Sequence, residues 1–172
     1  MQTTFVSFLL IALVLLSGCA QSPPQGNGSS ETIVAAGDTV SVEYEGKLQD
    51  GNVFDSSEKA GKPFSFAVGS KQAIEGFDSA VIGMQEGQEK TVTIQPENAY
   101  GQYDNTKVVE LPKSQFADPD KMVVGLPVHA SNGVNGVVKE IKDDSIVVDF
   151  NHPLAGKTLI FWIKIVKIEK AK

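Results

Sequence analysis

Short runs in which polar and apolar residues alternate are the feature of this sequence that most restricts its fold. Residues 38–44 alternate in this way, residues 62–68 do so again before Gly69, and residues 91–94 form a third run. Successive side chains of a strand point to opposite faces, so this alternation indicates strands with one buried and one exposed face. The Asp-Gly pair at residues 50–51 is typical of a turn between two strands. The chain is therefore expected to build an antiparallel sheet.

One segment has the spacing of a helix instead. Between residues 72 and 84 the apolar positions are three or four residues apart, at Ile74, Phe77, Val81 and Met84. This spacing places their side chains on one face of an amphipathic helix. One short helix among several antiparallel strands predicts the α+β fold class.

The N-terminus carries the pattern of an export signal. Residues 8–16 form an uninterrupted apolar run, too short to span a bilayer but of the length of a signal-peptide core. A Leu-Ser-Gly sequence precedes Cys19, the chain's single cysteine, and this arrangement resembles the lipobox of lipoprotein signal peptides. We therefore expect residues 1–18 to be removed and Cys19 to be lipidated, which predicts a membrane-anchored lipoprotein outside the cytoplasm. The alternative is a buried core thiol, since free cysteines are usually buried. Residues 1–4 also contain no lysine, whereas a signal peptide normally begins with positive charge.

The segment after Cys19 has the composition of a tether. It is rich in Gly, Ser, Pro and Gln and contains no large apolar residue before Ile33, so it cannot bury a core. Residues 19–36 are therefore expected to be a lipidated flexible linker.

Composition excludes several classes of function. The net charge is −6, and all 15 positive charges are lysines, because the sequence contains no arginine. Proteins that bind nucleic acid concentrate positive charge and rely on arginine, so no nucleic-acid partner is expected. One cysteine with His129 and His152 cannot build a multi-cysteine metal site. We expect no metal and no cofactor.

Four ordered blocks of the sequence resemble the FKBP-type peptidyl-prolyl isomerases. They are Tyr-Glu-Gly at 44–46 with Val-Phe-Asp-Ser-Ser at 53–57, Pro-Phe-Ser-Phe at 63–66, Ile-Glu-Gly-Phe at 74–77, and Ala-Tyr-Gly at 99–101. The pattern breaks after Gly101 and resumes at residues 151–161, in a block that resembles the SlyD branch of the family. Members of that branch carry an insert-in-flap domain at this break.

The resemblance covers residues 37–172 and implies the organisation of the chain. An isomerase domain would comprise residues 37–102 and 150–172, as an antiparallel sheet wrapped on one short helix. Residues 103–149, here called the insert, would form a small, mostly β domain. The residues themselves agree, because strands are indicated over 134–142 and 145–150, with Asn-Gly before the first as a hairpin signal.

The resemblance also implies which residues form the site. The catalytic positions correspond to Tyr44, Phe54, Asp55, Tyr100 and Phe161, and the substrate-binding positions to Phe64, Ile74, Phe77, Leu159 and His152. Phe77 would form the floor under the proline ring. Ile74 would donate its backbone N–H to one substrate carbonyl and Tyr100 its hydroxyl to another. Asp55 would accept a hydrogen bond from Tyr44 at the pocket edge.

Each of these assignments has a plainer alternative. Aromatic residues also build the cores of domains of this size. Asp55 could instead cap a short helix, since residues 55–58 have the pattern of a capping box. A lone histidine such as His152 is more often structural than a ligand.

Two functions from different classes remain open. The first is an isomerase that acts on unfolded or proline-containing polypeptides, and the second is a non-catalytic holdase chaperone that binds unfolded chains. We expect isomerisation with chaperone activity from the insert, in a monomeric protein. The apolar residues of the insert that would bind clients, or that would alternatively form its own small core, are Val108, Val109, Leu111, Phe116, Met122, Val123 and Leu126.

Overall fold

The computed structural model describes residues 32–130 and 133–172. The predicted signal peptide, Cys19 and most of the predicted linker lie outside the described residues. Within the described ranges, no helix is long and apolar enough to cross a membrane.

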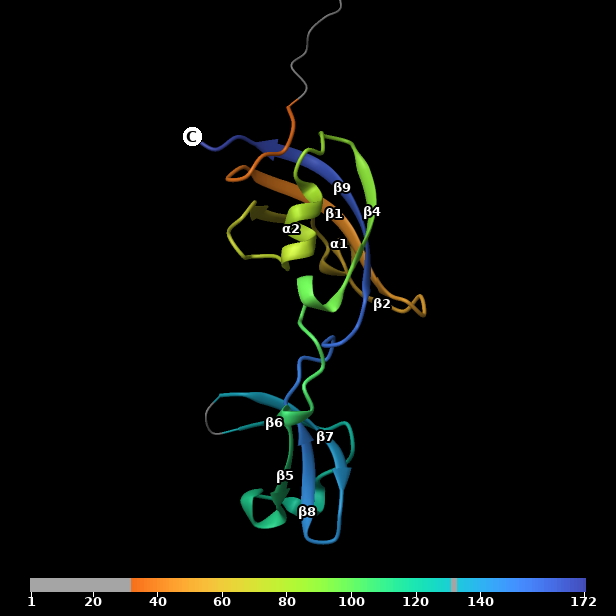
Figure 1. Cartoon of the computed structure of the whole chain (residues 1–172), viewed down its shortest axis with the longest axis vertical. Helices are drawn as coiled ribbons and strands as arrows, with labels where there is room; N and C mark the ends of the chain where they lie inside the picture. Colours follow the sequence, from red (N-terminus) through yellow and green to blue (C-terminus); the bar gives the residue numbers. More distant parts are fainter. Residues whose placement is uncertain (1–31, 131–132) are drawn as a thin grey trace, which may run out of the picture. The chain divides into compact units, whose positions relative to one another are not determined.

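A five-stranded antiparallel sheet is the first of two sheets in the described residues (Figure 1). Its strands are β1 (Thr39–Leu48), β2 (Val53–Ser56), β3 (Phe64–Ala67), β4 (Glu89–Ile94) and β9 (Leu159–Glu169). Neighbouring strands follow the order β2, β1, β9, β4, and β3 pairs with β1. The three alternating runs of the sequence lie in β1, β3 and β4, which confirms the predicted antiparallel sheet.

The core of this sheet comes from the inward-facing residues of β1 and β9. Val40 and Val42 of β1 and Ile163 and Ile165 of β9 are completely buried. Their burial follows the two-residue period of a strand, because the side chains between them point to the other face. The helix α2 (Glu75–Val81) adds its own buried residues to this cluster and lies against the sheet in Figure 1.

α2 is shorter than its sequence spacing predicts. The spacing predicts a helix over residues 72–84, but Ile74 and Ile82, which flank α2, both have extended backbone. Met84 is nevertheless 3% exposed and belongs to the core, so a loop rather than a helix delivers its side chain. The other helical elements of the described residues are α1 (Ser57–Ala60) and the 3-10 turns η1 (Pro96–Asn98), η2 (Asn105–Lys107), η3 (Lys113–Gln115) and η4 (Pro119–Lys121).

The folded domain includes residues that the sequence assigned to the linker. Val34 is 2% exposed, and its N–H donates a hydrogen bond to the Met84 carbonyl at 2.8 Å. Ile33 forms an isolated β-bridge with Gln85. The prediction that the linker extends to residue 36 is therefore wrong, because this apolar pair is held against the folded domain.

A buried carboxylate ties the two ends of the domain together. Asp38 is 2% exposed and accepts hydrogen bonds from the Ala35 N–H at 2.8 Å, the Ala171 N–H at 3.0 Å and Lys170 Nζ at 2.6 Å. The Lys170 hydrogen bond is the main cause that lowers the pKa of Asp38 to about 2, followed by the two backbone N–H groups. Asp38 is therefore charged in the folded protein at neutral pH.

Residues of the insert build the second sheet. In the described residues it has four antiparallel strands in the order β5, β8, β7, β6, and these are β5 (Val108–Pro112), β6 (Pro127–His129), β7 (Asn135–Ile141) and β8 (Ser145–Asp149). Val138, Ile146 and Val148 form a small core of their own, each at most 1% exposed. The strands expected over 134–142 and 145–150 correspond closely to β7 and β8.

Candidate active site

An aromatic cluster gathers where β1, β2, β3, β9 and α2 meet. The rings of Phe77 and Phe161 are 5.1 Å apart at 80°, and those of Tyr44 and Phe77 are 5.8 Å apart at 85°. Such edge-to-face contacts are the favoured geometry of aromatic pairs. The other rings of the cluster are those of Phe54, Phe64 and Phe66.

Gly46 makes this close packing possible. A Cβ atom at this position would lie 2.7 Å from the Phe54 ring and 2.8 Å from the Phe161 ring. No side chain fits at those distances, so the glycine of the Tyr-Glu-Gly block leaves the space that the two rings occupy.

A cavity of about 370 Å³ opens beside the cluster. Phe77, which is 3% exposed, contributes to its apolar lining, and Phe161 is 5% exposed. Seven of the ten residues predicted for the site line this cavity, namely Tyr44, Asp55, Phe64, Ile74, Phe77, Tyr100 and Phe161.

The edge of the cavity carries one strong polar contact. The Tyr44 hydroxyl donates to Asp55 Oδ2 at 2.8 Å, and Asp55 Oδ1 accepts from the Ser56 N–H at 2.9 Å. Burial, and then the hydrogen bond to Asp55, raise the pKa of Tyr44 to about 12. The helix cap is Ser56 rather than Asp55, because Ser56 Oγ accepts from the Lys59 N–H at 3.1 Å. The alternative interpretation of Asp55 as the cap is therefore wrong.

Two residues that line the cavity carry hydrogen-bond donors that have no partner among the described residues. Within the described residues, no atom accepts a hydrogen bond from the Ile74 N–H or forms one with the Tyr100 hydroxyl. Ile74 precedes α2, and its carbonyl accepts from Phe77 and Asp78, so the helix start holds its backbone in place. Burial and the charge of Asp55 raise the pKa of Tyr100, so its hydroxyl remains protonated at neutral pH. Both groups can donate to a bound ligand.

Three predicted residues do not line the cavity. Leu159 is completely buried in the core, so its assignment as a substrate contact is wrong. Phe54 packs edge-on against Phe161 with ring centroids 5.6 Å apart and supports that wall. His152 stacks on the Tyr100 ring, with centroids 3.8 Å apart and the planes 4° from parallel.

The cavity also includes residues that sequence reasoning missed. Lys71, Gln72 and Ala73 form one side, in the loop between β3 and α2. Gln72 is held there because its side-chain oxygen accepts from the Ala67 N–H at 3.1 Å, and Lys71 has a positive φ of 64°. The polar turn after Gly69 was the available signal, since loops on a rigid scaffold often carry binding residues.

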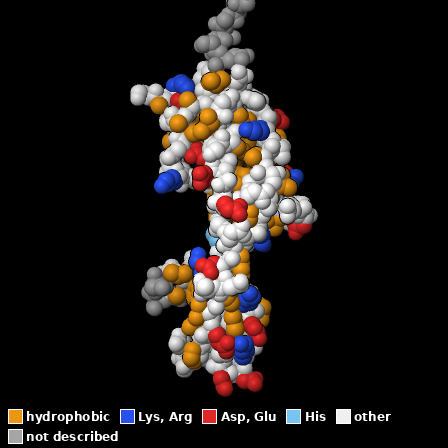
Figure 2. Space-filling model, in the orientation of Figure 1, with side chains coloured by type: hydrophobic (Ala, Val, Ile, Leu, Met, Phe, Trp, Pro, Cys, Tyr) orange, Lys and Arg blue, Asp and Glu red, His pale blue; other side chains and the backbone are white. Residues whose placement is uncertain are grey.

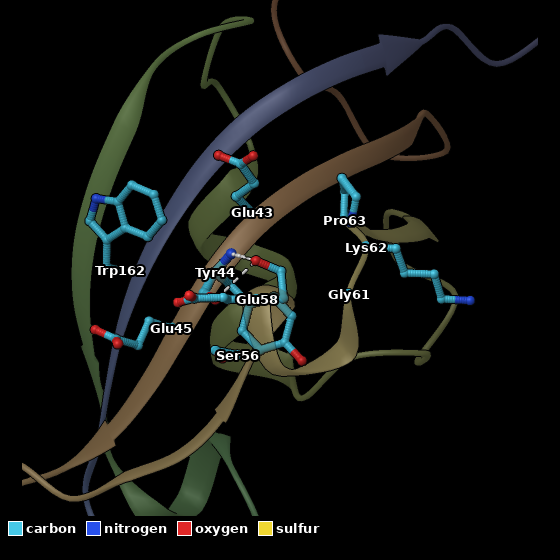
Figure 3. A pocket seen from close by; sticks show the side chains of 10 residues that line it. Glu43, Tyr44, Glu45, Ser56, Glu58, Gly61, Lys62, Pro63 and Trp162 are labelled. Atoms are coloured by element: carbon cyan, nitrogen blue, oxygen red, sulfur yellow. Dashed lines mark hydrogen bonds between the residues drawn. The ribbon is translucent and has the colours of Figure 1, made fainter.

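A larger cavity of about 490 Å³ also borders β1 and shares Tyr44 with the aromatic cavity (Figure 3). Figure 3 shows Glu43, Glu45 and Trp162 around it, and Glu58 also lines it. Glu43 and Glu45 flank Tyr44 along β1, so their side chains point to the face opposite the Tyr44 ring. Three of its lining residues are glutamates, and charged carboxylates do not suit a proline ring, which favours the aromatic cavity as the site.

The predicted client-binding residues of the insert differ in their exposure. Val109 and Val123 are 37% and 57% exposed. Val108 is half-buried, and the remaining four pack against the insert's own core: Leu111, Phe116, Met122 and Leu126. Among the residues that the structure describes, no group of three or more His, Cys, Asp or Glu side chains could hold a metal ion.

Comparison with known proteins assigns the family. Residues 30–166 match the family model described as FKBP-type peptidyl-prolyl cis-trans isomerase. The short-type peptidyl-prolyl cis-trans isomerase of Methanocaldococcus jannaschii is 40% identical, over 81% of this chain and 97% of that protein. The probable FKBP-type 16 kDa isomerase of Pseudomonas fluorescens is 38% identical, over 76% and 88%. The SlyD isomerase of Pasteurella multocida is 30% identical, over 80% and 70%. The chain therefore belongs to the FKBP-type peptidyl-prolyl cis-trans isomerases, which makes it an enzyme that isomerises X–Pro peptide bonds.

Proposed function

We propose that X–Pro isomerisation takes place in the aromatic cavity. Tyr44, Asp55, Tyr100 and Phe161 form the catalytic set, Phe54 supports Phe161, and the substrate contacts are Phe64, Ile74 and Phe77. The observation that carries this proposal is the composition of the cavity, because its lining combines aromatic rings with two hydrogen-bond donors that have no partner among the described residues.

The reaction explains why such a cavity suffices. Isomerisation breaks no bond, since the X–Pro amide only rotates through a twisted state against a barrier of roughly 18–20 kcal/mol. The twisted amide has lost resonance and its carbonyl is less polar, so leaving water costs it less than it costs the planar amide. An apolar cavity therefore stabilises the transition state more than the ground state, which is the condition for catalysis.

The two donors would hold the substrate on either side of the rotating bond. The Ile74 N–H is fixed by the start of α2, and the Tyr100 hydroxyl is protonated because its pKa is raised. Asp55 would polarise the edge of the cavity while bound to Tyr44, without acting as a general acid or base. No covalent or metal-bound intermediate is required by this scheme.

Tyr100→Ala tests the assignment of the cavity, with Tyr103→Ala as the matched control. Both tyrosines are 39% exposed, but only Tyr100 lines the cavity. Loss of the donor and the ring should lower turnover of an X–Pro tetrapeptide about tenfold or more in a protease-coupled assay, which corresponds to about 1.4 kcal/mol. Tyr103→Ala should leave turnover unchanged. Equal turnover of the two variants would contradict the assignment of this cavity as the site of isomerisation.

A chaperone activity of the insert is the second part of the proposal. Val123 and Val124 are adjacent and 57% and 66% exposed, and Val109 is 37% exposed. Figure 2 shows hydrophobic side chains on the surface of the insert, interspersed with charged ones. Exposed apolar side chains of this kind can hold unfolded segments, and binding there would raise the local concentration of X–Pro bonds for the cavity.

Exposed valines of the insert can be tested without disturbing its core. Val123→Ser with Val124→Ser should reduce suppression of aggregation of an unfolded client, measured by light scattering, and leave tetrapeptide turnover unchanged. Ile82→Ser is the matched control, because Ile82 is 50% exposed in the isomerase domain. An unaltered light-scattering curve for the double variant would argue against client binding at this surface.

Anchoring by a lipid on Cys19 completes the proposal and rests on the sequence alone. The apolar run and the Leu-Ser-Gly-Cys sequence support a lipoprotein outside the cytoplasm. Cys19→Ser keeps the size of the side chain but removes the thiol that must be alkylated. It should move the protein from the detergent phase to the aqueous phase in phase partitioning, and equal partitioning of both forms would exclude Cys19 as the lipid site.

A further inference from the structure

The stacked pair of Tyr100 and His152 joins two segments that are far apart in the sequence. Tyr100 follows η1, and His152 lies between β8 and β9, where the chain returns from the insert. Their ring centroids are 3.8 Å apart and their planes differ by 4°, the tightest aromatic contact of the described residues. A face-to-face contact of this kind fixes the plane of both rings.

The Tyr100 side chain depends on this contact for its orientation. In the described part of the chain its hydroxyl has no hydrogen-bond partner, whereas the Tyr44 hydroxyl is held by Asp55. The backbone beside Tyr100 is fixed, because the Gly101 N–H donates to the Pro96 carbonyl at 2.7 Å. The torsions of the exposed side chain are not fixed by these bonds, so the ring packed on its face determines where the hydroxyl points.

His152 is itself held firmly enough to serve as this support. Its Nδ1 atom accepts a hydrogen bond from the Leu154 N–H at 3.1 Å, and its carbonyl accepts from the Ala155 N–H at 2.8 Å. The neutral ring therefore carries its proton on Nε2, and burial lowers the pKa of His152, which favours this neutral form. The Gly156 N–H also donates to the Gly101 carbonyl at 2.8 Å, which binds the two segments directly.

We infer that His152 is a positioning residue for isomerisation: its ring holds the Tyr100 hydroxyl in the orientation that donates to the substrate. This inference rests on the proposed role of Tyr100 in the cavity. In this role His152 does not contact the substrate, whereas the sequence analysis expected it to be a substrate-binding residue.

Two substitutions of His152 separate stacking from hydrogen bonding. His152→Phe keeps a flat ring on Tyr100 but loses the acceptor for Leu154, whereas His152→Asn keeps an acceptor close to Nδ1 but loses the ring. His152→Ala loses both and should lower kcat about three- to tenfold with little change in KM, the range expected for loss of one aromatic contact. Phenylalanine should restore kcat and asparagine should not. His129→Ala, in the insert, is the matched control and should match the wild type.

A double-mutant cycle with Tyr100→Phe shows whether His152 acts through the hydroxyl. Tyr100→Phe keeps the ring and removes the hydroxyl, so His152→Ala should cause no further loss of kcat in that background. Kinetics would be measured by NMR exchange on an X–Pro tetrapeptide below and above KM, and the unfolding midpoint of each variant would be recorded to confirm that it is folded.

Several results would overturn the inference. These are wild-type kcat in His152→Ala, rescue by asparagine but not by phenylalanine, an effect on KM alone, and an effect of His152→Ala that persists in the Tyr100→Phe background. If Tyr100→Phe and Tyr100→Ala both keep wild-type turnover, the proposed role of Tyr100 fails and the role of His152 fails with it. If the Tyr100 variants lose turnover but the His152 variants keep wild-type kcat, the cavity assignment stands and only the inference about His152 is wrong.

Discussion

Phe161→Ala is the substitution that most directly probes the aromatic cavity, because this side chain belongs to both the core and the cavity wall. Phe161 is 5% exposed and packs against Phe77 at 5.1 Å, Phe54 at 5.6 Å and Tyr44 at 6.3 Å between ring centroids. Removal of the ring therefore removes a wall from the cavity and three aromatic contacts from the core at the same time.

The cost in stability follows from the surroundings of Phe161. Replacing a buried phenylalanine by alanine costs about 3–5 kcal/mol, and more when the site cannot collapse. Phe161 lies in β9 between β1 and β4, opposite Gly46 and Val92. The backbone hydrogen bonds of the sheet keep these neighbouring strands at their normal spacing, so the strands cannot move in to fill the space left by the ring. Gly46 has no side chain to fill the space. We expect a loss of about 4 kcal/mol, which a domain of typical stability, about 5–15 kcal/mol, survives in the folded state.

The effect on activity should exceed what the loss of stability explains. Turnover of an X–Pro tetrapeptide should fall tenfold or more, or about 1.4 kcal/mol of transition-state stabilisation. The assay couples isomerisation to proteolysis, and urea unfolding of the same sample gives the folded fraction, by which the rate is corrected.

Phe66→Ala is the matched control for Phe161→Ala. Phe66 is 2% exposed and stacks on Phe64 at 5.1 Å, but it does not line the cavity. Its removal should cost similar stability and leave turnover of the folded fraction much closer to that of the wild type. Wild-type turnover in folded Phe161→Ala, or equal losses in the two variants, would refute the assignment of Phe161 to the site.

Further predictions address the polar edge, the pH dependence, the ends of the domain and the insert. Asp55→Asn weakens the bond from Tyr44 and should lower turnover several-fold in the peptide assay, whereas Ser56→Ala should cost about 1 kcal/mol in thermal unfolding and leave turnover unchanged. Because the pKa values of Tyr44 and Tyr100 are raised, both hydroxyls stay protonated and turnover should be flat between about pH 7 and 9; a bell-shaped profile would indicate acid–base catalysis instead. The pKa of Asp38 falls from 3.8 to about 2 on folding, so its stabilisation is present above about pH 4 and is lost as the pH falls towards 2. The difference in unfolding temperature between the wild type and Asp38→Asn should accordingly shrink over that range, and a constant difference would contradict the assigned role. Replacing residues 103–149 by a short Gly-containing flap should keep tetrapeptide turnover within a few-fold of the wild type but slow catalysed refolding of a proline-limited protein far more. Equal losses of the two activities would mean that the insert is only a structural part of the cavity.

The strands were predictable because their signal is local. Alternation in residues 38–44 depends on which face of one strand is buried, and β1 buries Val40 and Val42 as that pattern requires. The helix signal was less reliable at its ends. Ile74 and Met84 have helical spacing with Phe77 and Val81, yet the core takes their side chains from non-helical backbone on either side of α2.

The cavity was only partly predictable, for a different reason. Aromatic positions such as Phe77 occur in family blocks, but Lys71 and Gln72 lie in a loop whose path depends on tertiary contacts. Gln72 reaches the cavity because its side chain binds the Ala67 N–H, and that contact has no signature in the spacing of residues. The N-cap of α1 could not be predicted for the same reason. Asp and Ser are both favourable N-cap residues, and only the structure shows that Ser56 caps the helix while Asp55 accepts a hydrogen bond from Tyr44.

The error at Leu159 shows how one strand can serve both the core and the site. Leu159 and Phe161 are two residues apart in β9, so both side chains point inwards, and the sequence offers no distinction between them. Their cross-strand partners differ, because Leu159 lies between Leu48 and Ile94, whereas Phe161 faces Gly46 on one side. Side chains close over Leu159, but the missing side chain at Gly46 lets the Phe161 ring extend to the cavity. Gly46, on the neighbouring strand β1, therefore determines that Phe161 reaches the cavity while Leu159 stays in the core.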